Sequence, residues 1–300
     1  MRIVIIGEPC IDVIHKADGR VYNEPGGISY SVVASAALNT ELEVVPVIGL
    51  HEDDRSYFTG LFDNFQSIDQ SAIYRSDQRT RRVDLFYEDE NNRWECSTQP
   101  IRPTNFSFIK NHLPAEGIFV NLISGEDITV ETLERIRKSA PASHLHIDLH
   151  NIVMSHLPDG KRVRVPVGNY LQWCSLADTI QMNEEEAAII DDSSPSMHDF
   201  AAKVLSCGPH ALVVTLAERG SVLFEKIGKE IKRHDIAPVA ASVVDPTGSG
   251  DVYGAAFLQQ VIQGSSYPEA ARYASAAASM KVKSAGPASM INWKAGELNV

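Results

Sequence analysis

The sequence predicts an α/β fold built around one central, mostly parallel β-sheet. Six short apolar runs have the length and composition of buried parallel strands, and helix-like segments lie between most of them. A chain of 300 residues can bury about 75% of its unfolded surface, so its core needs no disulfide or metal. The predicted strands are residues 3–6, 44–48, 118–122, 145–149, 179–182 and 211–216.

Residues 197–205 predict an amphipathic helix that crosses from one strand to the next. Ser196 is placed to cap its start, and Gly208 follows its end. Strands that alternate with such helices imply ligand sites beyond the carboxyl ends of the strands. The apolar positions recur at the spacing of one helix face: Met197, Phe200, Ala201, Val204 and Leu205.

Two segments depart from this pattern. Residues 18–25 are rich in turn formers, and residues 81–98 alternate apolar and polar positions on either side of a polar turn at 89–92, which is typical of an antiparallel hairpin. We expect a small β lid within residues 12–25 and 79–100. No repeat or linker marks a second domain, so residues 1–300 are expected to form a single domain with this lid.

The composition excludes several classes of partner. Lys and Arg number 27 against 39 Asp and Glu, a net charge of −12, which argues against a nucleic-acid binder. No apolar stretch approaches the length of a membrane span, so we expect no membrane partner. The four cysteines lie far apart without a Cys-x-x-Cys pair, which favours free thiols in the reducing cytoplasm.

The segment 242–258 carries the strongest chemical signal. An apolar approach leads to Gly248, Ser249, Gly250 and Asp251, followed by a run of small residues suited to close helix packing. At a helix start the amides of these four residues would lack intrahelical partners, and with the helix dipole they would form a site for phosphate. Asp251 would stand beside that site as a base. On its own, an aspartate at this position is often only a helix cap.

Two familiar nucleotide-binding motifs are absent. The chain has no Gly-x-x-x-x-Gly-Lys-Ser/Thr, and its first predicted strand is followed by Gly7-Glu8-Pro9 rather than Gly-x-Gly-x-x-Gly. A P-loop NTPase and an NAD-dependent oxidoreductase are both disfavoured.

The string Asp245-Pro246-Thr247-Gly248-Ser249-Gly250-Asp251 resembles the Asp-Thr-x-Gly-Ala-Gly-Asp signature of the ribokinase-like carbohydrate kinase (PfkB) family. The resemblance implies a ribokinase-like three-layer sandwich. It also implies that Asp251 deprotonates the acceptor hydroxyl while the amides of residues 248–251 hold the transferring phosphoryl group. A phosphoryl transition state spreads charge over its equatorial oxygens, so positioning and electrostatic stabilisation are what such a site must supply.

Two segments near the N-terminus are similar to the family's substrate-binding motifs. By that similarity, Asp12 would bind substrate hydroxyls, and Gly26 and Gly27 would shape the sugar pocket. Without the downstream signature they would be an exposed acid and a tight turn. Ser31 stands where sugar kinases of the family often have Asn, which leaves the substrate open.

Three further motifs are similar to the family's nucleotide side. Asn183 and Glu186 match its Asn-x-x-Glu motif, which implies that Glu186 serves the Mg²⁺ that accompanies ATP; the same residues also form a capping-box pattern. The segment with Thr215 and Gly220 resembles the family's nucleotide loop, with Ala217 in place of the first glycine; the alternative is a simple hairpin turn at Arg219-Gly220. Gly286 falls where the family closes its adenine pocket.

A polar face is predicted on the strand that begins at His144. His144, His146, Asp148 and His150 alternate with apolar residues, so all four are expected on one side of the strand. Same-face residues stand about 7 Å apart, so the four cannot all reach one metal ion.

We therefore expect an ATP-dependent phosphotransferase that phosphorylates an alcohol group of a sugar, nucleoside or cyclitol. The cofactors implied are ATP and Mg²⁺, and a monovalent cation stays open. The alternative is a non-catalytic ligand-binding or regulatory protein on the same fold. The exposed hairpin near residues 83–94 could also pair with a second copy of the chain.

Overall fold

The computed structural model describes residues 1–87, 93–97, 102–157, 161–293 and 298. Its central element is a sheet in which the described residues form eight strands, in the order β16-β15-β14-β13-β10-β9-β1-β4. Neighbouring strands are parallel except at β15, which is antiparallel to both β14 and β16. The strands are β1 Arg2–Ile6, β4 Glu43–Val47, β9 Gly117–Asn121, β10 His144–Asp148, β13 Thr179–Asn183, β14 Ala211–Thr215, β15 Ser221–Ile227 and β16 Glu230–Ile236.

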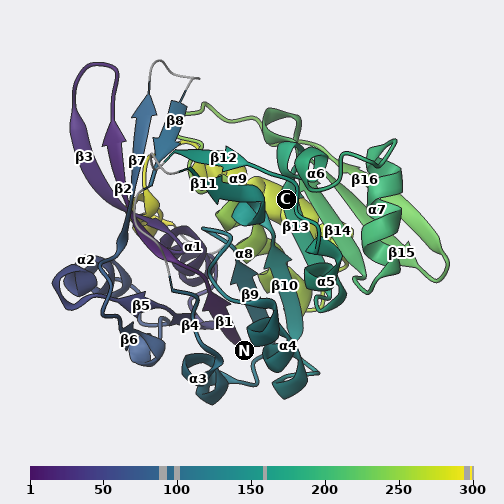
Figure 1. Cartoon of the computed structure of the whole chain (residues 1–300), viewed down its shortest axis with the longest axis horizontal. Coiled ribbons are helices and arrows are strands. Elements are labelled where there is room, and N and C mark those ends of the chain that lie inside the picture. The colour runs from purple at the N-terminus through teal and green to yellow at the C-terminus, as the bar shows by residue number, and fades with distance from the viewer. Residues whose placement is uncertain (88–92, 98–101, 158–160, 294–297, 299–300) are drawn as a thin grey trace.

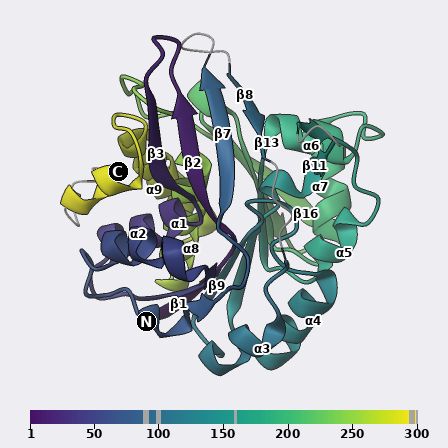
Figure 2. The same ribbon diagram turned by 60° about the vertical axis from the view of Figure 1, so that its left-hand side comes forward.

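Helices cover both faces of this sheet (Figures 1 and 2). Alternate residues of β1 show why: Ile3 and Ile5 join the apolar cluster on one face, and Val4 and Ile6 join the cluster on the other. The first face is covered by α1 Ser29–Leu38, α8 Ser249–Ile262 and α9 Tyr267–Lys281. The second is covered by α3 Phe106–Ile109, α4 Val130–Ser139, α5 Tyr170–Ser175, α6 Glu184–Ile190 and α7 Met197–Ser206.

A second sheet stands away from this body, with strand order β3-β2-β7-β8 (Figure 2). It contains the predicted hairpin, because β7 and β8 pair antiparallel; the expected turn at 89–92 lies outside the described residues. The β lid expected within residues 12–25 is present as β2 and β3, although the turn-rich residues 18–25 do not all form turn. Their second half forms a strand, because pairing with β2 satisfies the backbone there. The strands are β2 Pro9–His15, β3 Val21–Gly27, β7 Arg81–Tyr87 and β8 Arg93–Cys96.

Most of the predicted elements are confirmed. All six predicted strands occur within one residue of their expected bounds. Helix α7 begins after Ser196, whose hydroxyl accepts from the Asp199 amide at 3.2 Å. The apolar approach to Gly248 forms no buried strand, since Val243 and Val244 are each 64% exposed.

All four cysteines are free. Among the described helices, none combines the length and apolar character needed to cross a membrane.

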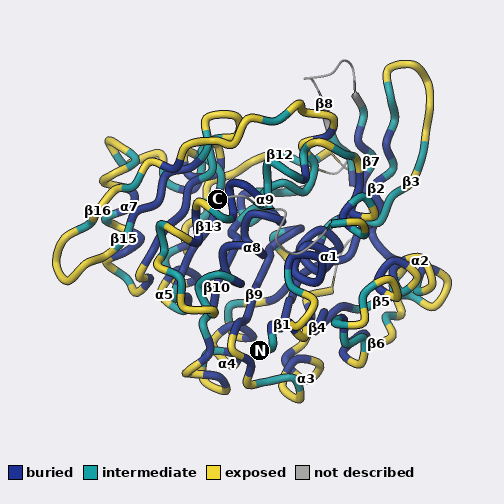
Figure 3. The backbone as a smooth tube through the Cα atoms, turned by 180° about the vertical axis from the view of Figure 1, so that it is seen from behind, coloured by how far each residue is buried: buried dark blue, intermediate teal, exposed yellow. Residues whose placement is uncertain are grey.

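The remaining elements are short or peripheral. They are α2 Glu52–Phe62, β5 Gly49–Leu50, β6 Tyr74–Arg75, β11 Met154–His156 and β12 Arg162–Arg164. Helices α1 and α8 are almost wholly buried, whereas the tip between β2 and β3 is exposed (Figure 3). The lid therefore has a solvated end and an inner end that faces the main body.

Candidate active site

A cavity of about 510 Å³ lies at the carboxyl ends of the parallel strands and reaches beneath the lid. This is the place where open α/β sheets bind ligands. Gly26 and Gly286 are not among its lining residues in the described part of the chain. Ten of the twelve predicted site residues line it: Asp12, Gly27, Asn183, Glu186, Thr215, Gly220, Gly248, Ser249, Gly250 and Asp251.

Gly248 is the N-cap residue of helix α8 and has a left-handed conformation, with φ +78°. A Cβ atom here would lie 2.2 Å from Cδ1 of Tyr30, a buried side chain of α1. Only glycine meets both demands, the positive φ and the close approach of the two helices. The glycine of the signature is thus required by the packing of α8 against α1.

The amides at the start of α8 fit the phosphate site only in part. Among the described residues, the amides of Gly248, Gly250 and Asp251 have no hydrogen-bond partner within the chain. The expectation for Ser249 was wrong, because its N–H donates to the Pro246 carbonyl at 3.2 Å across a tight turn. Three N–H groups at the positive end of the helix dipole remain for an anion.

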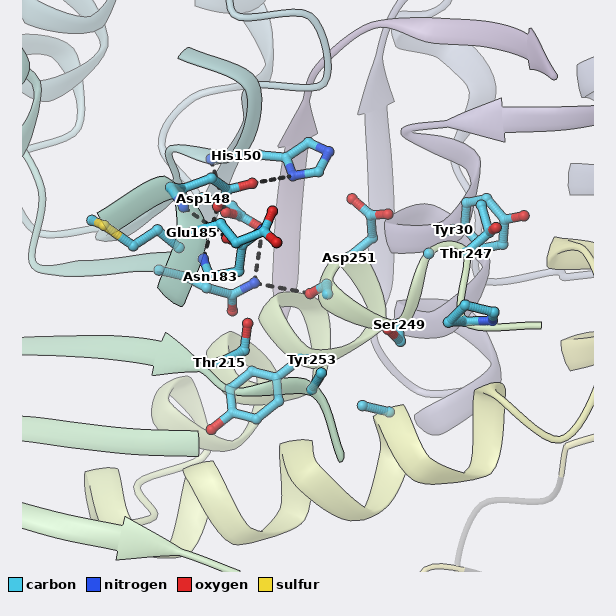
Figure 4. Close-up of a pocket in the computed structure, with 18 of the residues that line it drawn as sticks. Tyr30, Asp148, His150, Asn183, Glu185, Thr215, Thr247, Ser249, Asp251 and Tyr253 are labelled. Atoms are coloured by element: carbon cyan, nitrogen blue, oxygen red, sulfur yellow. Dashed lines mark hydrogen bonds and ion pairs between the residues drawn. The ribbon is translucent and has the colours of Figure 1, made fainter. Parts of the chain in front are cut away.

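The Asp251 carboxylate points into the cavity between His150 and Tyr30 (Figure 4). Its Oδ1 accepts from Asn121 Nδ2 at 2.6 Å, and the same nitrogen donates to Ser31 Oγ at 3.0 Å. Asn121 is the last residue of strand β9, directly beside the site. No sequence motif includes this residue, so it was not predicted. Its amide fixes the direction of the carboxylate and leaves the other carboxylate oxygen for a substrate hydroxyl.

Burial raises the pKa of Asp251 above its ordinary value, while the positive charge of His150 and the hydrogen bond from Asn121 lower it. A carboxyl with a raised pKa is a stronger base than an exposed aspartate once it is ionised. This shift favours a group that receives a proton from an alcohol.

Asp12 and Gly27 line the part of the cavity beneath the lid. Asp12 is 5% exposed, and its Oδ1 accepts from the Cys10 thiol at 3.2 Å. A Cβ on Gly26 would lie 2.2 Å from Asp12 Oδ2, so this glycine makes room for the carboxylate although it does not line the cavity. Gly27 lines the cavity with φ +57°.

Asn183 and Glu186 form the capping box that the sequence allowed. The Glu186 amide donates to Asn183 Oδ1 at 2.8 Å, and Glu186 Oε2 accepts from the Asn183 amide at 2.7 Å. The other Glu186 oxygen, Oε1, lies 3.3 Å from His150 Nδ1. Glu186 thus caps α6 with one oxygen and presents the other toward the cavity.

His150 does not lie on the strand face that was predicted for it. Strand β10 ends at Asp148, and His150 follows in a short turn with φ +26°, so its ring swings toward Glu186. Ligand atoms of Asp148, His150 and Glu186 lie within 4.8 Å of one another. Burial lowers the pKa of His150, but Glu186 and Asp148 outweigh it and raise that pKa to about 10. His150 therefore lies against the carboxyl groups of both Glu186 and Asp148.

The remaining predicted residues lie apart from this cluster. Thr215 ends β14 and Gly220 lies in the loop that follows it; both line the cavity, and in this loop Ala217 has φ +52°. This is a conformation that glycine adopts at lower cost, consistent with a loop in which alanine replaces glycine. Gly286 instead packs against Glu24 of β3, since a Cβ there would lie 2.5 Å from Glu24 Oε2.

Lys281 is a functional candidate that the sequence did not reveal. Its side chain is fully buried, and its Nζ donates to the Asp245 carbonyl at 3.1 Å and to Asp245 Oδ2 at 3.4 Å. Nζ also lies 5.2 Å from the centre of the Tyr30 ring. Asp245 Oδ1 in turn accepts from the Thr247 amide at 3.0 Å. Lys281 therefore braces the loop that leads into Gly248.

Solved structures show the same fold. The sulfate complex of a pyrophosphate-dependent kinase in the ribokinase family aligns with a TM-score of 0.82 at 20% identity, covering 98% of this chain and 100% of that one. Arabidopsis thaliana ribokinase complexed with ribose and ATP aligns with a TM-score of 0.72 at 19% identity, covering 96% and 94%. The ribokinase-like α/β sandwich with a β lid is confirmed.

Curated relatives carry kinase names. Cytidine kinase of Thermococcus kodakarensis is 23% identical over 276 residues, which are 91% of this chain and 92% of that protein. Arabidopsis thaliana ribokinase is 35% identical over 113 residues, which are 36% of this chain and 29% of that protein. The model of the pfkB family carbohydrate kinases matches residues 115–294, more than half of the chain. The chain therefore belongs to the pfkB family of carbohydrate kinases, phosphotransferases that act on small polyols.

Proposed function

We propose that this protein transfers the γ-phosphoryl group of ATP to an alcohol group of a small polyol, with Asp251 as the base. The observation that carries the proposal is that one cavity is lined both by the Asp251 carboxylate and by three residues at the start of α8 whose amides have no hydrogen-bond partner among the described residues. The amides of Gly248, Gly250 and Asp251 would hold the phosphoryl oxygens, and Asp251 would take the proton of the attacking hydroxyl. Asn121 would keep the carboxylate aimed at that hydroxyl.

The two ends of the cavity suggest where the substrates lie. The end beneath the lid, with Asp12 and Gly27, would hold the polyol. The end beside the β14 loop, with Thr215 and Gly220, would hold the nucleotide. Three of the similar solved structures are described as pyrophosphate-dependent kinases, so the choice of donor is tested with both ATP and pyrophosphate.

Mg²⁺ fits the carboxylates of Glu186 and Asp148, because it prefers oxygen ligands and keeps several waters. When bound, it would neutralise the charge of the donor phosphates.

We propose no need for a monovalent cation, because the Lys281 ammonium already brings a buried positive charge to the loop before Gly248. Equal initial rates in potassium and tetramethylammonium salts are expected, and a potassium requirement would contradict this.

The function is tested by measuring ADP release with a panel of ribose, fructose, myo-inositol and cytidine. We expect release to depend on one class of these acceptors. Pyrophosphate replaces ATP in a parallel series, with phosphate release as the readout. Binding of an acceptor without turnover of either donor would instead identify the non-catalytic binding protein.

Two wider proposals follow from the same features. The four free thiols support a location in the reducing cytoplasm.

The lid sheet ends in β3 and β8 as edge strands, which could pair with a second copy of the chain. Light scattering after size-exclusion chromatography would show a dimer if the lid pairs, and a monomer if it does not.

A further inference from the structure

Arg162, the first residue of β12, is a buried cation that lines the active-site cavity. Its side chain is 3% exposed, and its Nη1 donates to Glu95 Oε1 of the lid strand β8 at 2.8 Å. The neighbouring residue, Lys161, bridges to Cys96 of the same strand. Arg162 therefore sits where β12 meets the lid strand β8, at the edge of the cavity.

Two nitrogens of this guanidinium are unsatisfied. Nε and Nη2 are buried and have no hydrogen-bond partner among the described residues. These two nitrogens form one edge of the planar guanidinium, and their N–H groups point in parallel. Burying such donors without partners costs free energy, so the arrangement is favourable only when two adjacent acceptor atoms occupy that edge.

The charges around Arg162 decide which acceptor pair fits. A carboxylate and a pair of neighbouring hydroxyls both match a guanidinium edge. The positive charge of Arg162 is already paired with Glu95, and its neighbour Arg81 is already paired with Glu8. Asp12 and Asp251 line the same cavity. A further anion would be repelled by these carboxylates, whereas a hydroxyl can donate to a carboxylate and accept from the guanidinium at once.

We propose that Arg162 is a specificity-determining residue whose Nε–Nη2 edge binds two vicinal hydroxyls of a neutral polyol beneath the lid. This inference rests on the proposed function and names the acceptor class for the same cavity. A third hydroxyl of that polyol would be the one presented to Asp251. Glu95 would hold the guanidinium in the required orientation.

The test compares Arg162→Met and Arg162→Lys with Arg164→Met. Lysine keeps a positive charge for Glu95 but loses the two parallel donors. Arg164 lies two residues along β12, is about half exposed and pairs with Glu185 at 2.9 Å outside this contact, so it is the matched control. We expect both Arg162 variants to raise KM for the accepted polyol about tenfold or more, with a much smaller change in kcat. Arg164→Met should leave KM unchanged.

A deoxy analogue separates the hydroxyl contact from a structural effect. Removing one vicinal hydroxyl from the acceptor should raise KM for the wild-type protein and have little effect on Arg162→Met. A wild-type KM in Arg162→Lys, equal sensitivity of Arg162→Met to the missing hydroxyl, or a preference for a sugar acid over the neutral polyol would each overturn the inference.

Binding measurements keep this result independent of catalysis. The same four acceptors are titrated into Asp251→Asn protein by calorimetry, with and without Arg162→Met. If wild-type protein turns over no donor but Asp251→Asn binds a polyol through Arg162, the inference stands and the kinase proposal fails. If no neutral polyol binds, the inference fails.

Discussion

At residue 248 the chain permits only glycine, and residue 250 offers a matched comparison. Gly248→Ala would force a left-handed conformation and a contact with Tyr30, so we expect it to lower the free energy of unfolding by about 2 kcal/mol or more. A Cβ at Gly250 meets nothing within 4 Å, and Gly250→Ala should raise that free energy by about 0.5–1 kcal/mol. Urea unfolding of both variants checks this; equal effects would contradict the assigned backbone.

The hydrogen bond from Asn121 predicts a pH effect. Asp251 must be ionised to act as a base, so kcat/KM falls as pH drops through its pKa, which burial has raised. Asn121→Ala removes a hydrogen bond that lowers this pKa, so the acid limb of the pH profile should move to higher pH. The charged groups His150, Lys281 and Glu186 that also act on Asp251 stay in place. If the acid limb of the kcat/KM profile does not move in Asn121→Ala, that limb reflects the ionisation of a group other than Asp251.

A smaller change in the free energy of unfolding is predicted for a substitution at Ala217. Its φ of +52° is costly for alanine, so Ala217→Gly should relieve about 1–2 kcal/mol of strain. Glycine also gives the unfolded chain more conformational freedom, which lowers the free energy of unfolding by about 0.4–1 kcal/mol. We expect a small net gain in the free energy of unfolding by urea titration, and a clear loss would contradict the conformation.

At the scale of elements, Lys281 connects α9 to the loop before α8. Lys281→Met leaves Asp245 buried without its charge partner, and we expect a loss of about 3–5 kcal/mol in the free energy of unfolding. Asp245→Asn combined with Lys281→Met removes both charges and should recover part of that loss. If the double variant is no more stable than Lys281→Met, the two side chains do not act as a pair.

The elements that the sequence predicted are those with local signals. The six buried strands, helix α7 and the capping box of α6 follow from apolar runs and capping residues that are close in sequence. Strand β3 was missed because its pairing with β2 depends on the lid as a whole. Strand β16 pairs with β15 and was missed because its exposed, charged residues form no apolar run.

The residues of the candidate site also fall into those with a local sequence signal and those without one. Motif residues such as Asp251 and Glu186 were found because a resemblance marks them. Asn121 and Lys281 were missed, and His150 was assigned to the wrong position, because their roles arise from contacts with residues far away in the sequence: Asn121 with Asp251, His150 with Glu186, and Lys281 with Asp245.

On the scale of the whole molecule, the lid has much less apolar support than the main body. Its own cluster consists of Cys10, Ile14, Val83 and Leu85 with Tyr22 beside it, whereas the central sheet is packed on both faces. Opening of the lid should therefore cost less free energy than opening of the main sheet. The lid is the part of the molecule best suited to admit a substrate.

Hydrogen exchange tests this difference. We expect the amides of β7 to exchange faster than those of β9 in the free protein, and to gain protection when Asp251→Asn protein binds ATP and its acceptor. The amides of β14 serve as the internal control. Equal exchange in β7 and β9, with or without ligands, would contradict a lid that closes over the cavity.

The most direct test of the account is the rate of phosphoryl transfer by Asp251→Asn. Asp199→Asn is the matched control, because Asp199 also lies in the first turn of a helix but outside the cavity. We predict that Asp251→Asn lowers kcat by about 10²–10⁴-fold with ATP binding unchanged, whereas Asp199→Asn has no effect. Turnover by Asp251→Asn at the rate of the wild-type protein would contradict the role of Asp251 as the base.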